Sequence, residues 1–359
     1  ALGWGMNARG STEVVVATIG LATGALSQNL FTMILAMAVV TTMAMPPMLR
    51  WSLARVPMRP EEEARLEREA FEAEGFVTNM ERLLVTVDDS PSGRLASRLV
   101  GLLAGSRRIP TTILPSQPRL RSPCTKKSEA LAKATAATAE PDSREAAAPP
   151  PVDITTRPQS HPVEEAVAQE ARKGYDLLVI GVEPVAEAGV LDDKVARIAA
   201  EFKGPFAIVA ARGSHRRGET GRPLDILVPV TGTGFSRRGA EVALTLAHAD
   251  QGSVTALYVA MPSRRSLHRR IPPPWAIGAD EEAILREIVG LGDQVGVPVR
   301  TAVRTQIAAE EAILRQLKSG KHNAIVMGVS PRPGGTLFFG NVPAAILAKS
   351  ERSVMFVSS

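Results

Sequence analysis

Two short polar turns in this sequence have hydroxyl or carboxylate side chains that can form hydrogen bonds at the start of a helix. Each turn follows an apolar run that predicts a strand and precedes an amphipathic segment that predicts a helix. Hydroxyl and backbone N–H groups at the start of a helix donate hydrogen bonds to phosphate. The same side chains can instead cap the helix by accepting hydrogen bonds from its first N–H groups. The residues concerned are Asp88 and Ser90 in the first turn and Thr231 and Thr233 in the second.

A glycine-containing loop follows the apolar run 323–328 and leads into another predicted helix. Glycine has no side chain, so its backbone N–H can approach a phosphate closely. Pro331 works against such a site because proline has no N–H to donate. The alternative is a tight turn in which Asn341 is the helix N-cap. The candidate residues of this loop are Gly328, Arg332, Gly334, Gly335, Gly340 and Asn341.

The corresponding loop earlier in the chain is acidic. Val182, Glu183 and Pro184 follow Gly181, and further carboxylates come after them. Carboxylates at this place would repel a phosphate, so we expect no phosphate binding in the first half of the soluble region. The carboxylates meant are Glu187, Asp192 and Asp193.

Other reactive residue types form no recognisable site. The histidines are scattered without the spacing of metal ligands, and the single cysteine, Cys124, excludes both an intramolecular disulfide and a cysteine zinc cluster. We therefore expect no metal site, no catalytic residues and no enzymatic activity. The histidines are His161, His215, His248, His268 and His322.

The N-terminal stretch 1–26 is apolar and rich in small residues, but it contains Arg9 and Glu13. Residues four positions apart lie on one face of a helix, so these two can pair with each other. Charges at membrane depth are costly and commonly functional, which makes an ion pathway the other interpretation.

The run 30–49 has twenty residues without a charge, enough for a helix of about 30 Å that spans a bilayer. Arginines follow it at 50, 55, 59 and 65, whereas the preceding connection 24–29 is uncharged. By the positive-inside rule, residues after about 50 are expected to be cytoplasmic. The charged segment 51–76 predicts a solvated helical linker.

The soluble part repeats itself at a separation near 145 residues. The segment 82–104 aligns without a gap with 225–247, and DLLVIGVEP from position 176 aligns with NAIVMGVSP from position 323. Each copy alternates strands and helices, which predicts an α/β fold: two tandem, doubly wound parallel-sheet domains preceded by one or two transmembrane helices. The predicted strands are 82–87, 110–114, 152–157, 175–181 and 206–210 in the first copy, and 225–230, 253–260, 297–304, 323–328 and 353–357 in the second.

Composition divides the chain further. We assign 1–50 to membrane helices, 51–76 to the linker, 77–212 to the first soluble domain and 222–359 to the second. A Pro-, Ala-, Lys- and Ser-rich insert at about 116–151 is expected to be disordered. The segment 212–222 reads as a basic linker between the copies.

The membrane end resembles the last two helices of the second class of monovalent cation:proton antiporters. The resemblance covers about fifty residues and rests on the segments 6–15 (MNARGSTEVV), 19–21 (IGL), 30–33 (LFTM), 41–42 (TT) and 46–47 (PP). It implies exchange of Na⁺ or K⁺ for H⁺ by an inverted-repeat bundle in the inner membrane. It also implies a homodimer, and ion-binding carboxylates that lie upstream of this chain. Since the chain does not begin with Met, we expect it to be a C-terminal fragment.

The two soluble copies resemble universal stress protein domains, some of which bind ATP. The binding members combine an Asp-x-Ser turn with a Gly-x-x-Gly and Gly-Ser/Thr loop. The first copy keeps Asp88 and Ser90 as a vestige and lacks the loop, whereas the second keeps glycines but has Pro331 and Asn341 at motif positions. The resemblance therefore allows the second copy to bind ATP or another nucleotide, and does not require it.

These patterns together predict an antiporter fragment that contacts the lipid bilayer and carries cytoplasmic regulatory domains. The alternative is a membrane-tethered stress-type protein that binds a nucleotide or small ligand without transport. A nucleotide-hydrolysing domain is a third alternative. The net charge of +5 suggests nucleic acid, but 4% aromatic residues and the lack of a groove-reading motif argue against that partner.

Overall fold

The computed structural model describes residues 10–53, 75–116, 123–141, 152–157, 162–183, 193–219, 221–260, 279–331 and 339–358. The chain divides into two compact units, Ala1–Phe71 and Glu72–Ser359.

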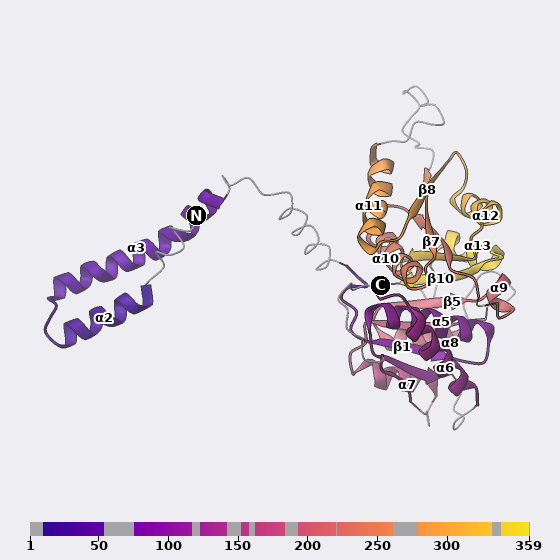
Figure 1. The fold of residues 1–359 in the computed structure, drawn as a ribbon, viewed down its shortest axis with the longest axis horizontal. Helices are drawn as coiled ribbons and strands as arrows, with labels where there is room; N and C mark the ends of the chain where they lie inside the picture. Colours follow the sequence, from indigo (N-terminus) through magenta and orange to yellow (C-terminus); the bar gives the residue numbers. More distant parts are fainter. Residues whose placement is uncertain are drawn as a thin grey trace. The chain divides into compact units, whose positions relative to one another are not determined.

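The N-terminal unit contains two helices that contact each other, α2 (Gly10–Ala22) and α3 (Gln28–Leu53) (Figure 1). Gly24, at φ +73°, helps to form the turn between them, because this backbone conformation favours glycine. Within the described part of the chain, no helix is both long and apolar enough to cross a membrane. The uncharged run 30–49 that predicted a span includes residues whose side chains lie outside this description.

The outer surface of these helices is nevertheless apolar. Among the described residues, all the large apolar side chains that are exposed belong to α2 and α3. These are Val15, Val16, Ile19, Leu30, Met33, Leu35, Met37, Val39, Val40, Met43 and Met48.

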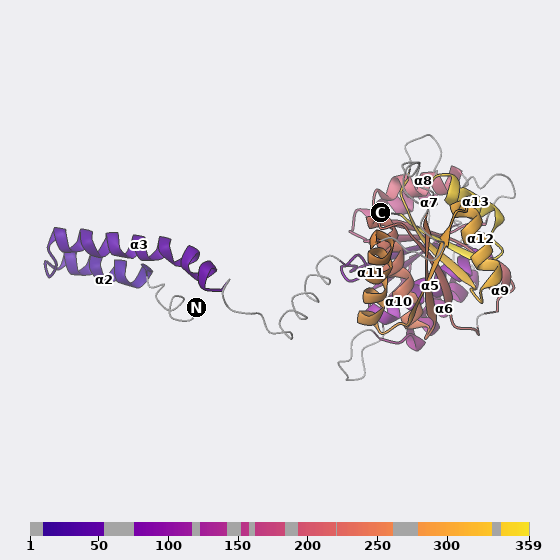
Figure 2. The same ribbon diagram turned by 90° about the horizontal axis from the view of Figure 1, so that it is seen from above.

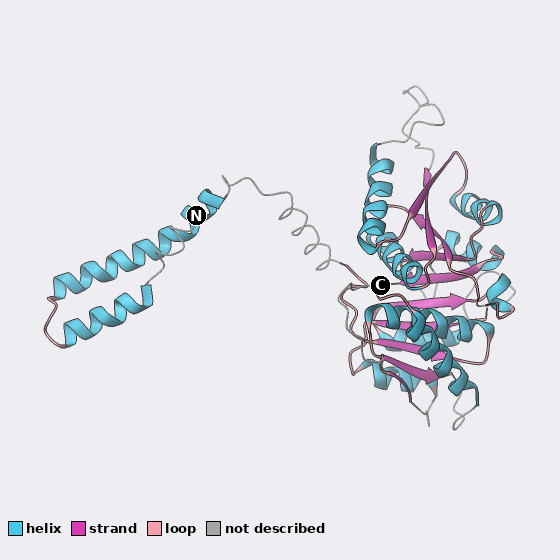
Figure 3. Ribbon diagram, in the orientation of Figure 1, coloured by secondary structure: helices cyan, strands magenta, loops and turns pink. Residues whose placement is uncertain are grey.

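The C-terminal unit is built on one ten-stranded sheet, with the order β3-β2-β1-β4-β5-β10-β9-β6-β7-β8 (Figure 3). Pairing is parallel within each copy and antiparallel where β5 meets β10. The strands of the first copy are β1 (Leu83–Val87), β2 (Thr111–Pro115), β3 (Ile154–Thr156), β4 (Leu177–Gly181) and β5 (Phe206–Ala210). Those of the second are β6 (Asp225–Val230), β7 (Ser253–Ala260), β8 (Val299–Thr305), β9 (Ala324–Val329) and β10 (Ser353–Ser358).

The predicted strands are confirmed to within two residues at every bound, and the sheet within each copy is parallel. The copies do not have separate sheets, however. Val354 pairs with Ala210 and Ser358 with Phe206, which joins the two copies along their edge strands. Each edge strand would otherwise present unpaired backbone N–H and C=O groups, so this pairing satisfies both edges at once.

Helices cover both faces of the sheet (Figure 2). One face carries the contacting series α6 (Pro123–Thr138), α5 (Pro91–Arg107), α10 (Gly234–Ala249) and α11 (Ala279–Val295). On the other face, α7 (Val163–Ala171) contacts α8 (Asp193–Phe202), and α12 (Ala309–Ser319) contacts α13 (Asn341–Lys349).

The prediction that 116–151 is disordered is wrong for its central part, which forms α6. Ala132 of this helix is fully buried against α5. A Cβ at Gly101 would lie 2.6 Å from the Ala132 carbonyl oxygen, and one at Gly105 would contact the Ala136 carbonyl. Glycines in α5 thus allow an alanine-rich helix to pack closely, although its composition alone suggested disorder. The parts of the insert at 117–122 and 142–151 lie outside the described residues.

The basic segment 212–222 is also more than a linker. It contains the short helix α9 (Gly213–Arg216), and His215 within it is buried. The His215 Nδ1 lies 2.8 Å from the hydroxyl oxygen of Ser353 at the start of β10. The segment is therefore fastened to the second copy.

The aromatic core crosses the boundary between copies. The Phe339 ring lies 6.2 Å from that of Phe206 in β5 and 5.8 Å from that of Phe356 in β10, measured between centroids. Such tilted pairs stabilise a core beyond the area they bury. The two copies thus fold around shared apolar contacts.

Candidate functional site

The turn of the second copy brings Thr231 and Thr233 together at the start of α10. Their hydroxyl oxygens are 3.0 Å apart, and the Thr233 hydroxyl accepts from the Ser236 N–H at 3.3 Å. The Ser236 hydroxyl in turn accepts from the Thr231 N–H at 3.3 Å. Thr233 is therefore the helix N-cap, and both threonines already serve the turn.

Gly328 lies at the carboxyl end of β9, beside this turn, because β9 pairs in parallel with β6. A Cβ on Gly328 would lie 1.7 Å from the Phe235 carbonyl oxygen in the first turn of α10. A Cβ on Gly239 would likewise lie 2.5 Å from the Gly328 N atom. These glycines let the helix cross the strand closely, which is a packing requirement independent of any ligand.

The loop after β9 is only partly placed. Arg332, Gly334 and Gly335 lie outside the described residues. Gly340, at φ 106°, is the N-cap of α13 and has no side chain to accept a hydrogen bond. The alternative in which Asn341 is the N-cap is wrong, since Asn341 is the first helical residue. The positive φ explains the glycine at the cap.

In the first copy, the hydrogen bonds of the turn run between different residues, Asp88, Ser90 and Gly93. The Asp88 carboxylate accepts hydrogen bonds from the Ser90 N–H at 3.1 Å and from its hydroxyl at 2.5 Å. Ser90 is the N-cap of α5 and accepts from the Gly93 N–H at 3.0 Å. Asp88 thus holds the cap instead of capping the helix itself.

In the first copy, Glu183 is the acid that contacts the start of α5. Its carboxylate accepts from the Ser92 hydroxyl at 2.9 Å and from the Ser92 N–H at 3.3 Å, in the first turn of α5. A phosphate at this helix end would have to displace the Glu183 carboxylate. Asp193 begins α8 with an exposed side chain, whereas Glu187 and Asp192 lie outside the described residues.

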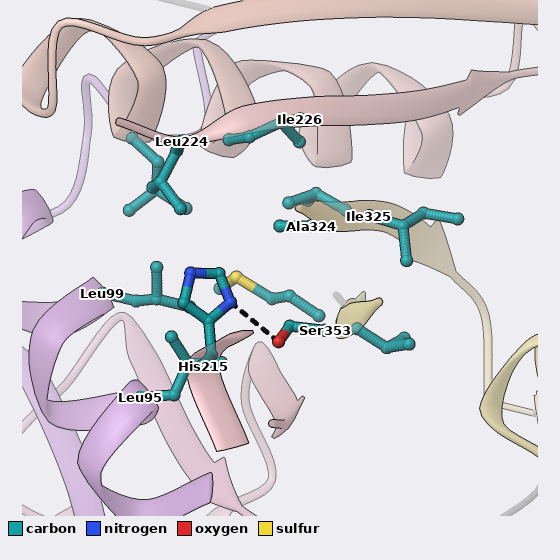
Figure 4. Close-up of a pocket in the computed structure, with 12 residues that line it drawn as sticks. Leu95, Leu99, His215, Leu224, Ile226, Ala324, Ile325 and Ser353 are labelled. Carbon is teal, nitrogen blue, oxygen red and sulfur yellow. Dashed lines mark hydrogen bonds between the residues drawn. The ribbon is translucent and has the colours of Figure 1, made fainter. Parts of the chain in front are cut away.

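A small cavity lies where the two copies meet (Figure 4). Leu95 and Leu99 come from the first copy, and Leu224, Ile226, Ala324 and Ile325 from the second, with His215 beside them. Its volume of about 10 Å³ matches that needed for one water molecule. Burial, and then the charge of Arg98, lower the pKa of His215 to about 4. The cavity is therefore a packing feature with a neutral histidine.

An open hollow of about 360 Å³ lies near the end of α13. Arg212, Arg216, Lys349 and Glu351 contribute its charged groups. The Arg212 guanidinium donates to the Leu347 carbonyl at 2.6 Å, which satisfies a backbone oxygen in the last turn of the helix. Cations at this position also offset the partial negative charge of the helix C-terminus.

The side chains of the two residues predicted to line an ion pathway are not among those that the structure describes. Arg9 lies outside the described residues, and Glu13 lies in α2 with its side chain outside them. No group of histidine, cysteine or acidic side chains in the described ranges could hold a metal ion.

Comparison with known proteins gives two kinds of similarity. The model of the universal stress protein family matches residues 224–358. A segment of 49 residues is 45% identical to the Na(+)/H(+) antiporter NhaS4 of Synechocystis sp. (strain ATCC 27184 / PCC 6803 / Kazusa), covering 14% of this chain. The chain spans only 12% of that antiporter's length.

Solved structures show weaker likeness. A universal stress protein from Archaeoglobus fulgidus DSM 4304 is 14% identical, with a TM-score of 0.48, over 77% of this chain and 98% of that one. One from Pseudomonas aeruginosa UCBPP-PA14 is 16% identical, with a TM-score of 0.47, over 79% of this chain and 94% of that one. The family match and the parallel α/β sheet agree over the second copy: residues 224–358 are a universal stress protein domain.

Proposed function

We propose that this chain is the C-terminal part of a Na⁺ (or K⁺)/H⁺ antiporter of the inner membrane, and that its tandem stress-type domains regulate exchange. The observation that carries the proposal is the 49-residue match to an antiporter in a chain that also holds a universal stress protein domain. The match is about as long as the fifty-residue stretch that resembles antiporter helices.

The surface of the N-terminal helices supports a membrane environment. Exposed apolar side chains such as Val16 (67% exposed) and Met43 (74%) have no covering partner in the described part of the chain. Water disfavours such a surface, whereas lipid tails or further transporter helices would cover it. On this proposal Arg9 and Glu13 lie near the ion pathway, and residues after about 50 are cytoplasmic.

The proposal assigns the soluble part a regulatory role without an enzymatic step. The joined sheet gives the two copies a common core, so a ligand or a second protein copy that alters one domain can affect the other. The proposed partners are Na⁺ or K⁺ and H⁺, the bilayer and a second copy of the whole protein.

Cation-dependent proton movement tests the proposal. The full-length protein that contains this chain is reconstituted in vesicles, with and without residues 77–359. We expect exchange with either Na⁺ or K⁺, and a changed rate or ion dependence after the deletion. Absence of exchange contradicts the transport assignment, and identical exchange by both proteins contradicts the regulatory one.

The rival is a tethered ligand-binding protein in which the N-terminal helices only attach the domains to a membrane. It shares the exposed helices but needs no ion pathway. The coding sequence upstream separates the two: about ten further apolar spans with intramembrane aspartates favour the antiporter. An immediate start codon favours the tether.

A further inference from the structure

The residues that enter the first copy are held by the second. The Glu241 carboxylate in α10 accepts hydrogen bonds from the N–H groups of Phe76, at 2.5 Å, and Val77, at 3.4 Å. The guanidinium carbon of Arg238 lies 5.7 Å from the centroid of the Phe76 ring. Val77 and Met80 are only 2% and 6% exposed. This short segment therefore belongs to the folded unit, and Phe76, the last residue of the predicted linker, is part of it.

The anchor is built from groups that need each other. Glu241 is 6% exposed, and a buried carboxylate is stable only with hydrogen-bond donors or cations around it. Phe76 and Val77 supply two donors, and Arg237 lies 3.3 Å from the other carboxylate oxygen. Charge-assisted bonds of this kind are stronger than neutral ones. Loss of the carboxylate would leave the buried Val77 N–H without its acceptor.

Helix α10 connects this anchor to the polar turn that contains Thr231 and Thr233. Thr233 caps the helix, and Glu241 follows eight residues later, about 12 Å along the axis. The same helix contacts α5 of the first copy and lies against β9, where Gly328 touches its first turn. A displacement of α10 by a ligand, or by movement between the copies, therefore reaches Phe76 through one rigid element.

We propose that the contact of Glu241 with the backbone of Phe76 and Val77 couples the second domain to the chain that leads to the N-terminal helices. The first domain follows this segment directly in sequence, and its Arg107 lies 3.5 Å from the Thr78 hydroxyl, but the backbone N–H groups of Phe76 and Val77 are bound by the second domain. Regulation of exchange then depends on α10, and this last step rests on the function proposed above.

Hydrogen exchange tests the anchor in the full chain. Glu241→Met keeps the side-chain length and removes the acceptor, and we expect the Phe76 and Val77 amides to exchange about tenfold faster or more. Glu287→Met is the matched control, because Glu287 also lies near Arg237, at 3.5 Å, but is not a partner of these amides. Unchanged exchange in Glu241→Met overturns the anchor.

Protection of the β6 and β7 amides, measured in the same experiment, reports whether the variant is folded. If Glu241→Met is unfolded, Arg238→Met replaces it, since this change removes the contact with the Phe76 ring and leaves the carboxylate in place. Faster exchange confined to the segment 75–80 supports the anchor in either variant, and unchanged exchange there opposes it.

Transport tests the coupling separately. In vesicles, Glu241→Met should change the rate of cation/proton transport in the same direction as deletion of residues 77–359 does. Glu287→Met should transport like the wild type. If the amides of Glu241→Met open but transport is unchanged, the coupling is wrong. If deletion of residues 77–359 leaves transport unchanged, the regulatory function proposed above fails. The hydrogen-exchange measurement still decides whether Glu241 anchors Phe76 and Val77.

Discussion

Arg98 in α5 and Asp250 after α10 form an ion pair across the two copies, in which one guanidinium nitrogen lies 3.0 and 2.9 Å from the two carboxylate oxygens. Their side chains are 6% and 16% exposed. The Asp250 carboxylate also accepts from the Leu224 N–H at 2.8 Å, at the entry to β6. The pair thus joins α5 of the first copy to the beginning of the second.

Replacement of Arg98 by methionine should destabilise the soluble unit by about 3 kcal/mol. The change leaves the carboxylate of Asp250 largely buried with no cation against it, which costs more than the net value of the pair. Denaturant unfolding followed by circular dichroism measures the loss. Arg217→Met, which removes an exposed ion pair with Glu219, should cause no measurable change. Equal stability of wild type and Arg98→Met would contradict the assignment.

Acidification should weaken the unit through His215. Its pKa is about 4 when folded and near 6.5 when unfolded, so between these values the unfolded chain binds more protons. This residue's contribution is therefore constant above about pH 6.5 and declines by up to about 3 kcal/mol as pH falls to 4. Burial raises the pKa of Glu241, which gives the opposite slope as that group takes up its proton.

A variant separates these opposing effects. In His215→Gln the titrating group is lost, so the free energy of unfolding should fall less steeply between pH 6.5 and 4 than in wild type. Parallel curves for wild type and His215→Gln would show that His215 does not set this dependence.

Gly328→Ala should destabilise the second domain by about 3 kcal/mol, because the new Cβ meets the Phe235 carbonyl oxygen and the backbone has to move. Gly290→Ala in α11, where a Cβ meets nothing within 4 Å, should be neutral or stabilising by up to about 1 kcal/mol. Thermal unfolding in the absence of nucleotide checks both. Normal stability of Gly328→Ala would remove the packing role and favour a ligand role for this glycine.

The full chain should show no saturable heat of binding with ATP, ADP or AMP at millimolar concentration. In the second copy the Thr231 and Thr233 hydroxyls bond within the turn, and Pro331 lacks an N–H. In the first copy Glu183 holds the start of α5. Calorimetry is the test. Saturation that disappears in Thr233→Val, with the fold retained, would establish the site that we expect to be absent.

The repeat and its strands were predictable from the sequence because they depend on local patterns. Apolar runs such as 225–230 and 253–260 form strands that are mostly buried, and their alternation with helices implies parallel pairing. The polar turns were also placed correctly, since each follows the carboxyl end of a strand. Their hydrogen-bond partners were not predictable, because Asp88 and Thr231 act through neighbours whose side-chain directions depend on the packed helix.

Only the tertiary structure decided how the copies join and what holds them. The pairing of β5 with β10, the packing of α6 on Gly101 and Gly105, and the Glu241 anchor all connect residues far apart in the chain. No local pattern distinguishes an alanine-rich segment that forms a buried helix from one that is disordered. Likewise, the sequence does not show whether a carboxylate accepts hydrogen bonds from a distant backbone segment or is solvated. Their stability comes from close approach and from burial of polar groups with partners, which exist only after the two copies have folded together.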